Sequence, residues 1–137
     1  MKKILLLMVS LSLFASIHWI DDFDAAYAKA KKVHKPLFVF IHRLYPPCHW
    51  CERMERETLD DANISHYIDA HFIPVKLEKS TSFYPEELTP KYVPTIYIIQ
   101  GDKVIKTIVG FWNVNDFASD LADVERILHD ESNTSKE

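Results

Sequence analysis

The sequence predicts an α/β domain, with a central mixed β-sheet and helices on both of its faces. Apolar runs of strand length alternate with amphipathic segments along the first half of the chain, a pattern typical of parallel strands joined by helices. Two β-rich runs near residue 100 are separated by a short polar turn, which predicts an antiparallel pair. With 137 residues, the chain has room for one compact domain.

The first predicted helix and the first strand are separated by a proline. Asp21 or Asp22 can cap a helix that runs to about His34, because apolar residues recur along it at three- and four-residue spacing. Pro36 ends this helix. Residues 37–41 then form a continuous apolar run, which is typical of a strand buried on both faces.

A turn with two consecutive prolines leads from this strand to the next helix. Pro46 and Pro47 disfavour helix in the residues before them, so we expect an extended or turning segment there. The spacing of apolar and charged residues predicts a helix over 48–59 and a second helical segment over 62–70. A further strand is predicted over 72–77.

The last part of the chain adds a hairpin and a helix. A polar connection over 78–94 leads to two β-rich runs, 95–99 and 104–109, and the residues between them have turn chemistry. We therefore expect these two strands to pair antiparallel. Asn113 or Asn115 starts the final helix, whose apolar residues fall on one stripe.

The first 16 residues have the layout of a secretory signal peptide. A basic start with Lys2 and Lys3 is followed by the apolar run 4–14 and by the small residues Ala15 and Ser16, beside which cleavage is expected. The apolar run is shorter than the roughly 20 residues of a spanning helix. We therefore expect an exported protein with no stable membrane insertion after cleavage. An uncleaved anchor or a buried helix is the alternative.

These boundaries give a signal peptide at 1–16, one domain at 17–130 and a polar tail at 131–137. Without the two lysines of the leader, the chain has 14 basic and 20 acidic residues, a formal net charge of −6. Non-specific binding to nucleic acid depends on the neutralisation of phosphates by Lys and Arg. We therefore expect no nucleic-acid partner.

The only two cysteines, Cys48 and Cys51, enclose His49 and Trp50. A disulfide that closes so small a loop constrains the unfolded chain little, so this pair is better suited to redox turnover than to stabilisation. A helix N-terminus favours a thiolate, which predicts that Cys48 is the attacking sulfur and Cys51 the resolving one. His49 favours the thiolate further when it is protonated, and Trp50 shapes the surface around the sulfur.

Three other interpretations of the cysteine pair remain open. A zinc site needs about four ligands, and His42 or His71 would have to complete the two that this motif supplies. The pair could also be without function, or one cysteine could act alone with a histidine base. The redox interpretation accounts for both cysteines and for their position, and it requires neither a metal nor a cofactor.

The strand, the cysteine pair at a helix start and the segment Val93–Thr95 before a later strand resemble the thioredoxin superfamily over residues 18–129. The stretch Cys48–Cys51, followed by Met54–Glu55 and Glu57–Thr58, is similar to a thioredoxin-like subfamily with a Cys-His-Trp-Cys site. That subfamily includes stand-alone exported bacterial proteins. The resemblance implies the thioredoxin fold and a location in the bacterial periplasm.

The resemblance also implies roles for residues around the cysteines. Pro94 is expected to form a cis peptide bond that faces the pair, and the Val93 backbone is expected to bind an extended substrate segment. Pro46–Pro47 replaces the tryptophan that usually precedes the first cysteine. Tyr45 or Trp50 is then expected to supply the aromatic surface of the site.

One departure from the family pattern concerns the movement of protons. Many thioredoxins have a buried acid in the strand before the site, which helps to move protons at the second cysteine. Phe40 stands at that position here. His42 or Glu52 could replace the missing acid, although each is also interpretable as an ordinary solvated or hydrogen-bonded side chain.

Four aromatic residues lie outside the motif. Phe83 and Tyr84 belong to the polar connection, and Phe111 and Trp112 follow Gly110. We expect core or loop packing for all four rather than a place in a substrate groove.

The function that these features predict is an exported thiol–disulfide oxidoreductase that reduces or exchanges disulfides in partner proteins. Its partners would be protein thiols and disulfides, together with a membrane or soluble electron donor. A disulfide-donating oxidant is the nearest alternative, because a histidine between the cysteines favours oxidation. A binding or chaperone module without redox turnover and a thiol-dependent peroxide scavenger are further alternatives.

Overall fold

A computed structural model describes residues 16–136. The predicted signal peptide therefore lies outside the described residues, apart from Ser16. Within the described range, no helix is both long enough and apolar enough to cross a membrane.

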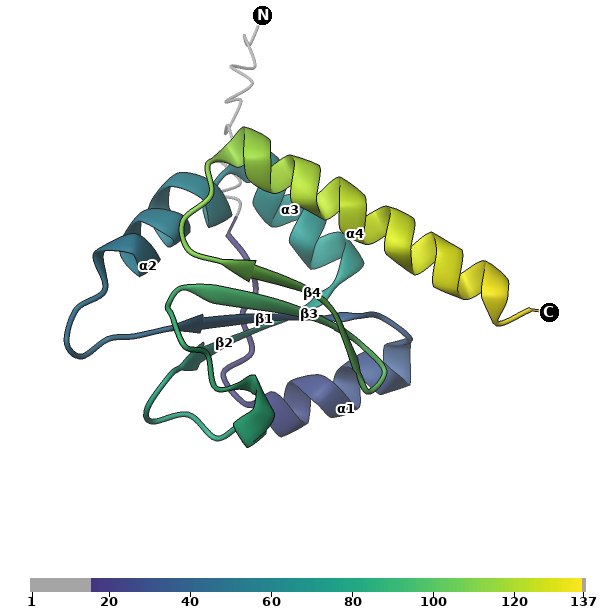
Figure 1. Cartoon of the computed structure of the whole chain (residues 1–137), viewed down its shortest axis with the longest axis horizontal. Helices are drawn as coiled ribbons and strands as arrows, with labels where there is room; N and C mark the ends of the chain where they lie inside the picture. The colour runs from purple at the N-terminus through teal and green to yellow at the C-terminus, as the bar shows by residue number, and fades with distance from the viewer. Residues whose placement is uncertain (1–15, 137) are drawn as a thin grey trace, which may run out of the picture.

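The described residues form a four-stranded sheet with helices on both faces (Figure 1). In chain order the elements are α1 (Phe23–Val33), β1 (Leu37–His42), α2 (His49–Arg53), the π-helical η1 (Met54–Leu59), α3 (Ala62–His71), β2 (Ile73–Glu78), the 3₁₀ turn η2 (Glu86–Leu88), β3 (Thr95–Gln100), β4 (Lys103–Val109) and α4 (Val114–Thr134). The strand order is β2-β1-β3-β4. Strand β1 runs parallel to β2 and antiparallel to β3, and β3 pairs antiparallel with β4. The mixed α/β sheet predicted from the sequence is confirmed.

Two apolar layers hold the helices on the sheet. On one face, Phe23 and Ala26 of α1 pack against Val39 and Ile41 of β1. On the other face, η1, α3 and α4 cover the remaining side of the same strand, as Figure 1 shows. Every residue of β1 is buried, as its continuous apolar run predicts. This central strand therefore fixes the position of the loop that follows it.

The predicted helix caps are present. Asp22 accepts a hydrogen bond from the Ala25 N–H at 2.7 Å, and the Asn113 side chain accepts one from the Asp116 N–H at 3.0 Å. Each bond satisfies an amide that the first turn of a helix leaves unpaired. At the other end of the chain, α4 continues to Thr134. Residues 131–134 of the predicted polar tail are therefore helical, and their polar side chains continue the exposed face of α4.

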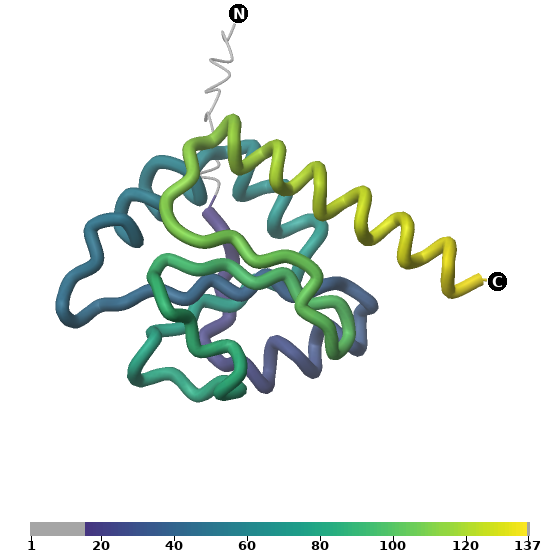
Figure 2. The backbone as a smooth tube through the Cα atoms, in the orientation of Figure 1, coloured from purple at the N-terminus to yellow at the C-terminus, as the bar shows by residue number. Residues whose placement is uncertain are grey.

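The segment that precedes α1 is part of the fold. Ile17 is buried in the core, and the Trp19 ring lies 6.0 Å from Phe38 and 5.7 Å from Phe40, centroid to centroid. Ile20 forms a parallel bridge with Val75 of β2. Figure 2 traces this purple segment past the sheet to α1.

Candidate active site

The cysteine pair lies at the start of α2, directly after the loop that follows β1. In this loop the Arg43 side chain donates a hydrogen bond to the Pro46 carbonyl at 2.9 Å, and the Tyr45–Pro46 peptide bond is cis. Cys48 has an extended backbone and occupies the position that caps the helix. The Pro-rich turn therefore delivers Cys48 to a helix N-terminus, where unpaired amides and the helix dipole favour negative charge on the sulfur.

Cys48 and Cys51 form a disulfide, with their Cα atoms 5.2 Å apart. The Cys51 N–H donates a hydrogen bond to the Cys48 sulfur at 3.2 Å. Cys48 is 6% exposed and Cys51 is 1% exposed, so Cys48 is the sulfur that a partner reaches more easily. In the reduced protein the same amide can donate to a Cys48 thiolate, which favours that ionised form. The order of exposure agrees with the predicted roles of attacking and resolving cysteine, which stay predictions.

The start of β3 brings a second loop to the disulfide. Ile41 pairs with Thr95 across the antiparallel strands, which places the residues before Thr95 beside the loop that leads to Cys48. The Val93–Pro94 peptide bond is cis, as the resemblance implies. The Val93 carbonyl oxygen lies 3.8 Å from the Cys48 sulfur. Because the disulfide sulfur carries no hydrogen, this is a contact; the corresponding thiol could donate a hydrogen bond to the same carbonyl.

An open hollow of about 400 Å³ lies beside this contact and is lined by Trp50, Val93, Gly110 and Phe111. The rings of Trp50 and Phe111 are 6.0 Å apart, centroid to centroid. The Arg53 guanidinium lies 4.4 Å from the Phe111 centroid and 5.3 Å from that of Trp50. A cation over both ring faces stabilises their arrangement. The hollow thus has two aromatic walls next to a strand-like backbone.

Two of the predicted site residues, Tyr45 and His49, do not line the hollow. Tyr45 is 87% exposed and does not line the hollow, so the aromatic wall beside the disulfide comes from Trp50 instead. His49 is exposed, and its ring meets that of Trp50 edge-on at 5.3 Å.

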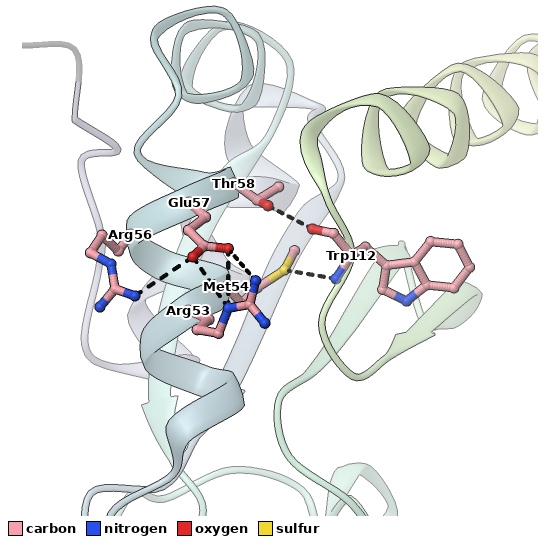
Figure 3. A network of polar contacts seen from close by, with 6 residues as sticks. All are labelled: Arg53, Met54, Arg56, Glu57, Thr58 and Trp112. Carbon is pink, nitrogen blue, oxygen red and sulfur yellow. Dashed lines mark hydrogen bonds and ion pairs between the residues drawn. The ribbon is translucent and has the colours of Figure 1, made fainter.

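A loop clamp, defined by Arg53, Met54, Glu57, Thr58 and Trp112, attaches the loop after β4 to the helix that carries the cysteines (Figure 3). The Trp112 N–H donates to the Met54 sulfur at 3.5 Å, and the Thr58 hydroxyl donates to the Trp112 carbonyl at 2.6 Å. Glu57 binds the Arg53 guanidinium, at 2.9 Å in the shortest contact, and these bonds lower the pKa of the Glu57 carboxyl. The clamp thereby holds Phe111, the residue before Trp112, at the hollow.

The clamp gives a testable contribution to stability. Thr58 is buried, and Thr58→Val keeps its shape while leaving the Trp112 carbonyl without its donor. We expect the free energy of unfolding, measured in urea, to fall by about 1–2 kcal/mol. Thr107→Val, the same change at an exposed position of β4, is the control and should stay within about 0.5 kcal/mol of the wild type. Equal losses in the two variants would contradict the clamp.

Sequence reasoning missed the role of the residues after β4. Phe111 packs at the edge of the core and also lines the hollow, whereas only packing was expected of it. The sequence Gly110-Phe111-Trp112 directly after a strand was the available signal. Phe83 is 96% exposed, so the expected packing role is wrong for this residue. Its ring lies in the polar connection, where no element covers it.

His42 and Glu52, the two expected replacements for the missing acid, lie in different surroundings. Phe40 is fully buried in the core, and His42 is 7% exposed and stacks on it at 5.8 Å. Burial lowers the pKa of His42, as does nearby Lys76, against the opposite effects of Glu55 and Glu78. Glu52, the other expected replacement for the missing acid, is exposed.

Histidine 71 is not positioned with the cysteines as a metal ligand. Its ring lies 4.3 Å from that of Tyr67, centroid to centroid, at the end of α3. Among residues 16–136, no three His, Cys, Asp or Glu side chains are grouped closely enough to hold a metal ion.

Residues 9–102 of the chain match the family model Thioredox_DsbH, which is described as "Protein of unknown function, DUF255". Spermatogenesis-associated protein 20 of Rattus norvegicus is 33% identical over 63 residues, which are 46% of this chain and 8% of that protein. The chain therefore spans a small part of the length of this relative.

Two solved structures share the fold. The structure described as "DsbH Oxidoreductase" superposes with a TM-score of 0.63 at 20% identity, covering 84% of this chain and 86% of that one. A thioredoxin from Thermus thermophilus superposes with a TM-score of 0.67 at 21% identity, covering 80% of this chain and 87% of that one. At these identities the likeness shows a thioredoxin-like fold, as the sequence resemblance implies.

Proposed function

The chain belongs to the Thioredox_DsbH (DUF255) family, and we propose that it is an exported thiol–disulfide oxidoreductase that reduces or exchanges disulfides in partner proteins. The observation that carries the proposal is the Cys48–Cys51 disulfide at the N-terminus of α2. A thioredoxin-like fold with such a pair supports thiol–disulfide redox activity. The basic and apolar leader supports export, with the bacterial periplasm as the compartment.

The proposed reduction proceeds in two exchanges. The Cys48 thiolate attacks one sulfur of the substrate disulfide, forms a mixed disulfide and releases the other sulfur as a thiolate. The Cys51 thiolate then attacks the Cys48 sulfur, which releases the second substrate thiolate and leaves Cys48 and Cys51 oxidised. The substrate gains two electrons and the pair loses two, so a membrane or soluble dithiol donor must reduce the pair again.

The surroundings of the disulfide suit a protein substrate. An extended segment can form hydrogen bonds with the Val93 backbone beside the cis Pro94 peptide, as a strand does at a sheet edge. A side chain of that segment can enter the hollow between Trp50 and Phe111. His49 and Trp50 separate the two cysteines, and their chemistry affects the balance between dithiol and disulfide.

The reduction potential of the Cys48–Cys51 pair tests this proposal. We expect a value of about −200 to −270 mV, measured by equilibration against glutathione, which is the range of reductants and exchange catalysts. A value near about −120 mV would assign the pair to a disulfide donor instead. A pair that never forms the disulfide in solution would favour the binding or chaperone module, and rapid oxidation of Cys48 by peroxide without a disulfide substrate would favour the scavenger.

A further inference from the structure

The resolving step requires Cys51 to lose its proton in a site that excludes water. Cys51 is 1% exposed, and burial in apolar surroundings disfavours the thiolate. Phe40, which is fully buried, occupies the strand position where an acid could have served. The proposed oxidoreductase therefore needs a proton acceptor from another element.

Alternation along the two parallel strands places several charged groups on the face that the cysteine-bearing helix covers. Phe40 faces this layer, and His42, two residues later, points to the same face. Lys76 lies opposite Phe40 in the register of β1 and β2, and Glu78 lies opposite His42. The carboxyl ends of both strands therefore present His42, Lys76 and Glu78 toward the helix.

The helix contributes one acid that meets these strands. Glu55 forms an ion pair with Lys76, and both side chains are partly buried. Cys51 and Glu55 are four residues apart on one continuous helical segment, so they lie on the same side of it, one turn from each other. Glu55 thus places a carboxylate, paired with a strand residue, one helical turn from Cys51.

Other carboxylates near the site are engaged elsewhere or point to solvent. Glu78 accepts hydrogen bonds from the backbone amides of Ser80 and Thr81, both at 2.7 Å. Glu57 is bound to Arg53, and Glu52 is exposed. Glu55, by contrast, is an acid of this helical segment that forms an ion pair with a residue of the sheet, Lys76 of β2.

We propose that Glu55, held by Lys76, accepts the proton of Cys51 during the resolving step, directly or through one water molecule. This inference rests on the proposed redox function. The Cys51 thiol gives its proton to the Glu55 carboxylate, and the resulting thiolate attacks the Cys48 sulfur and expels the substrate thiolate, which takes up a proton in turn. The electrons follow the disulfide exchange, and the carboxyl group returns its proton to solvent.

Glu55 is favoured over His42 as the acceptor because transfer to Glu55 creates no additional charges in the buried site. Proton transfer from Cys51 to Glu55 moves one negative charge from an oxygen to a sulfur, and the Lys76 ammonium remains to stabilise it. Transfer to His42 would instead create a new pair of opposite charges in a buried place. Burial and Lys76 lower the pKa of His42 by more than Glu55 and Glu78 raise it, so this second route is opposed by its surroundings.

The resolving step can be measured separately from the first attack. Reduced protein is mixed with one equivalent of a symmetrical aromatic disulfide whose thiolate is coloured. Attack by Cys48 releases the first coloured thiolate and leaves an aryl mixed disulfide on Cys48. Attack by Cys51 on that sulfur releases the second, so the two phases report on the two cysteines.

We expect Glu55→Gln to slow the second release at neutral pH by at least about tenfold and to move the midpoint of its pH profile upward. The first release should change by less than about twofold. The matched control is Glu52→Gln, which removes the same charge from the same helix at an exposed position and should leave both phases within about twofold of the wild type.

A conservative variant and a rival variant complete the test. Glu55→Asp keeps a carboxylate and should keep the wild-type pH midpoint even if its rate falls. The inference is overturned if Glu55→Gln behaves as Glu52→Gln does, if Glu55→Asp shifts the midpoint as far as Glu55→Gln, or if only His42→Gln removes the second phase. A wild-type protein without any second release would instead contradict the proposed function itself.

Discussion

Replacing Cys51 with alanine is expected to abolish turnover while leaving Cys48 covalently joined to partner proteins. The two Cα atoms are only 5.2 Å apart, so Cys51 is placed to attack any mixed disulfide that forms on Cys48. Without Cys51 that intermediate has no internal thiol to resolve it. We expect no catalysis above background in the reduction of insulin disulfides, and stable adducts on non-reducing gels of the exported fraction.

Cys48→Ala is the matched control for this experiment. It also removes one sulfur of the pair, but it leaves the buried Cys51, which is 1% exposed and poorly accessible to a protein disulfide. We therefore expect neither turnover nor adducts from this variant. Turnover by Cys51→Ala at the wild-type rate would contradict the two-cysteine mechanism, and adducts on Cys48→Ala in place of Cys51→Ala would reverse the two roles.

The largest loss of stability is expected from Phe38→Ala. Phe38 is fully buried in β1 and packs edge-on against Phe72, which directly follows α3, and against Phe117 of α4, at centroid distances of 5.8 and 6.3 Å. Its removal takes away contacts of the central strand with two helices at once and leaves a cavity. We expect the free energy of unfolding to fall by about 3–5 kcal/mol, measured by urea denaturation.

Phe83→Ala supplies the same change in composition without burial. Phe83 is 96% exposed, so its truncation should alter the free energy of unfolding by no more than about 0.5 kcal/mol. A loss in Phe38→Ala as small as this would mean that β1 and the two helices are not packed as described.

Local patterns predicted most of the elements. The run 37–41 is the buried central strand, and the Asp22 and Asn113 caps act where the sequence places them. These features depend on residues close together in the chain, so spacing and capping chemistry reveal them. The position of Cys48 at a helix start also follows from neighbours, since two prolines precede it and a helical pattern follows.

Long-range contacts were beyond such patterns. The hydrogen bonds of Trp112 to Met54 and Thr58 join residues more than 50 positions apart, and neither end signals its partner. Glu55 and Lys76 likewise carry no sequence signal for each other, and they meet because η1 covers the ends of the parallel strands. His42 and Glu52 are the acceptors that the sequence suggests; in the structure His42 is buried against Phe40, Glu52 is exposed, and Glu55 pairs with Lys76.

The segment before α1 also protects an edge of the sheet. An unpaired outer strand exposes amides and carbonyls to which a strand of another molecule can add. Here the Ile20 N–H donates to the Pro74 carbonyl and the Ile20 carbonyl accepts from the Lys76 N–H, both at 2.9 Å, so part of the outer edge of β2 is occupied. Cleavage beside Ser16, where the predicted leader ends, would retain this cover, whereas trimming past Ile20 would open the edge to self-association. The position at which a leader were cleaved would thus affect the tendency of the protein to self-associate.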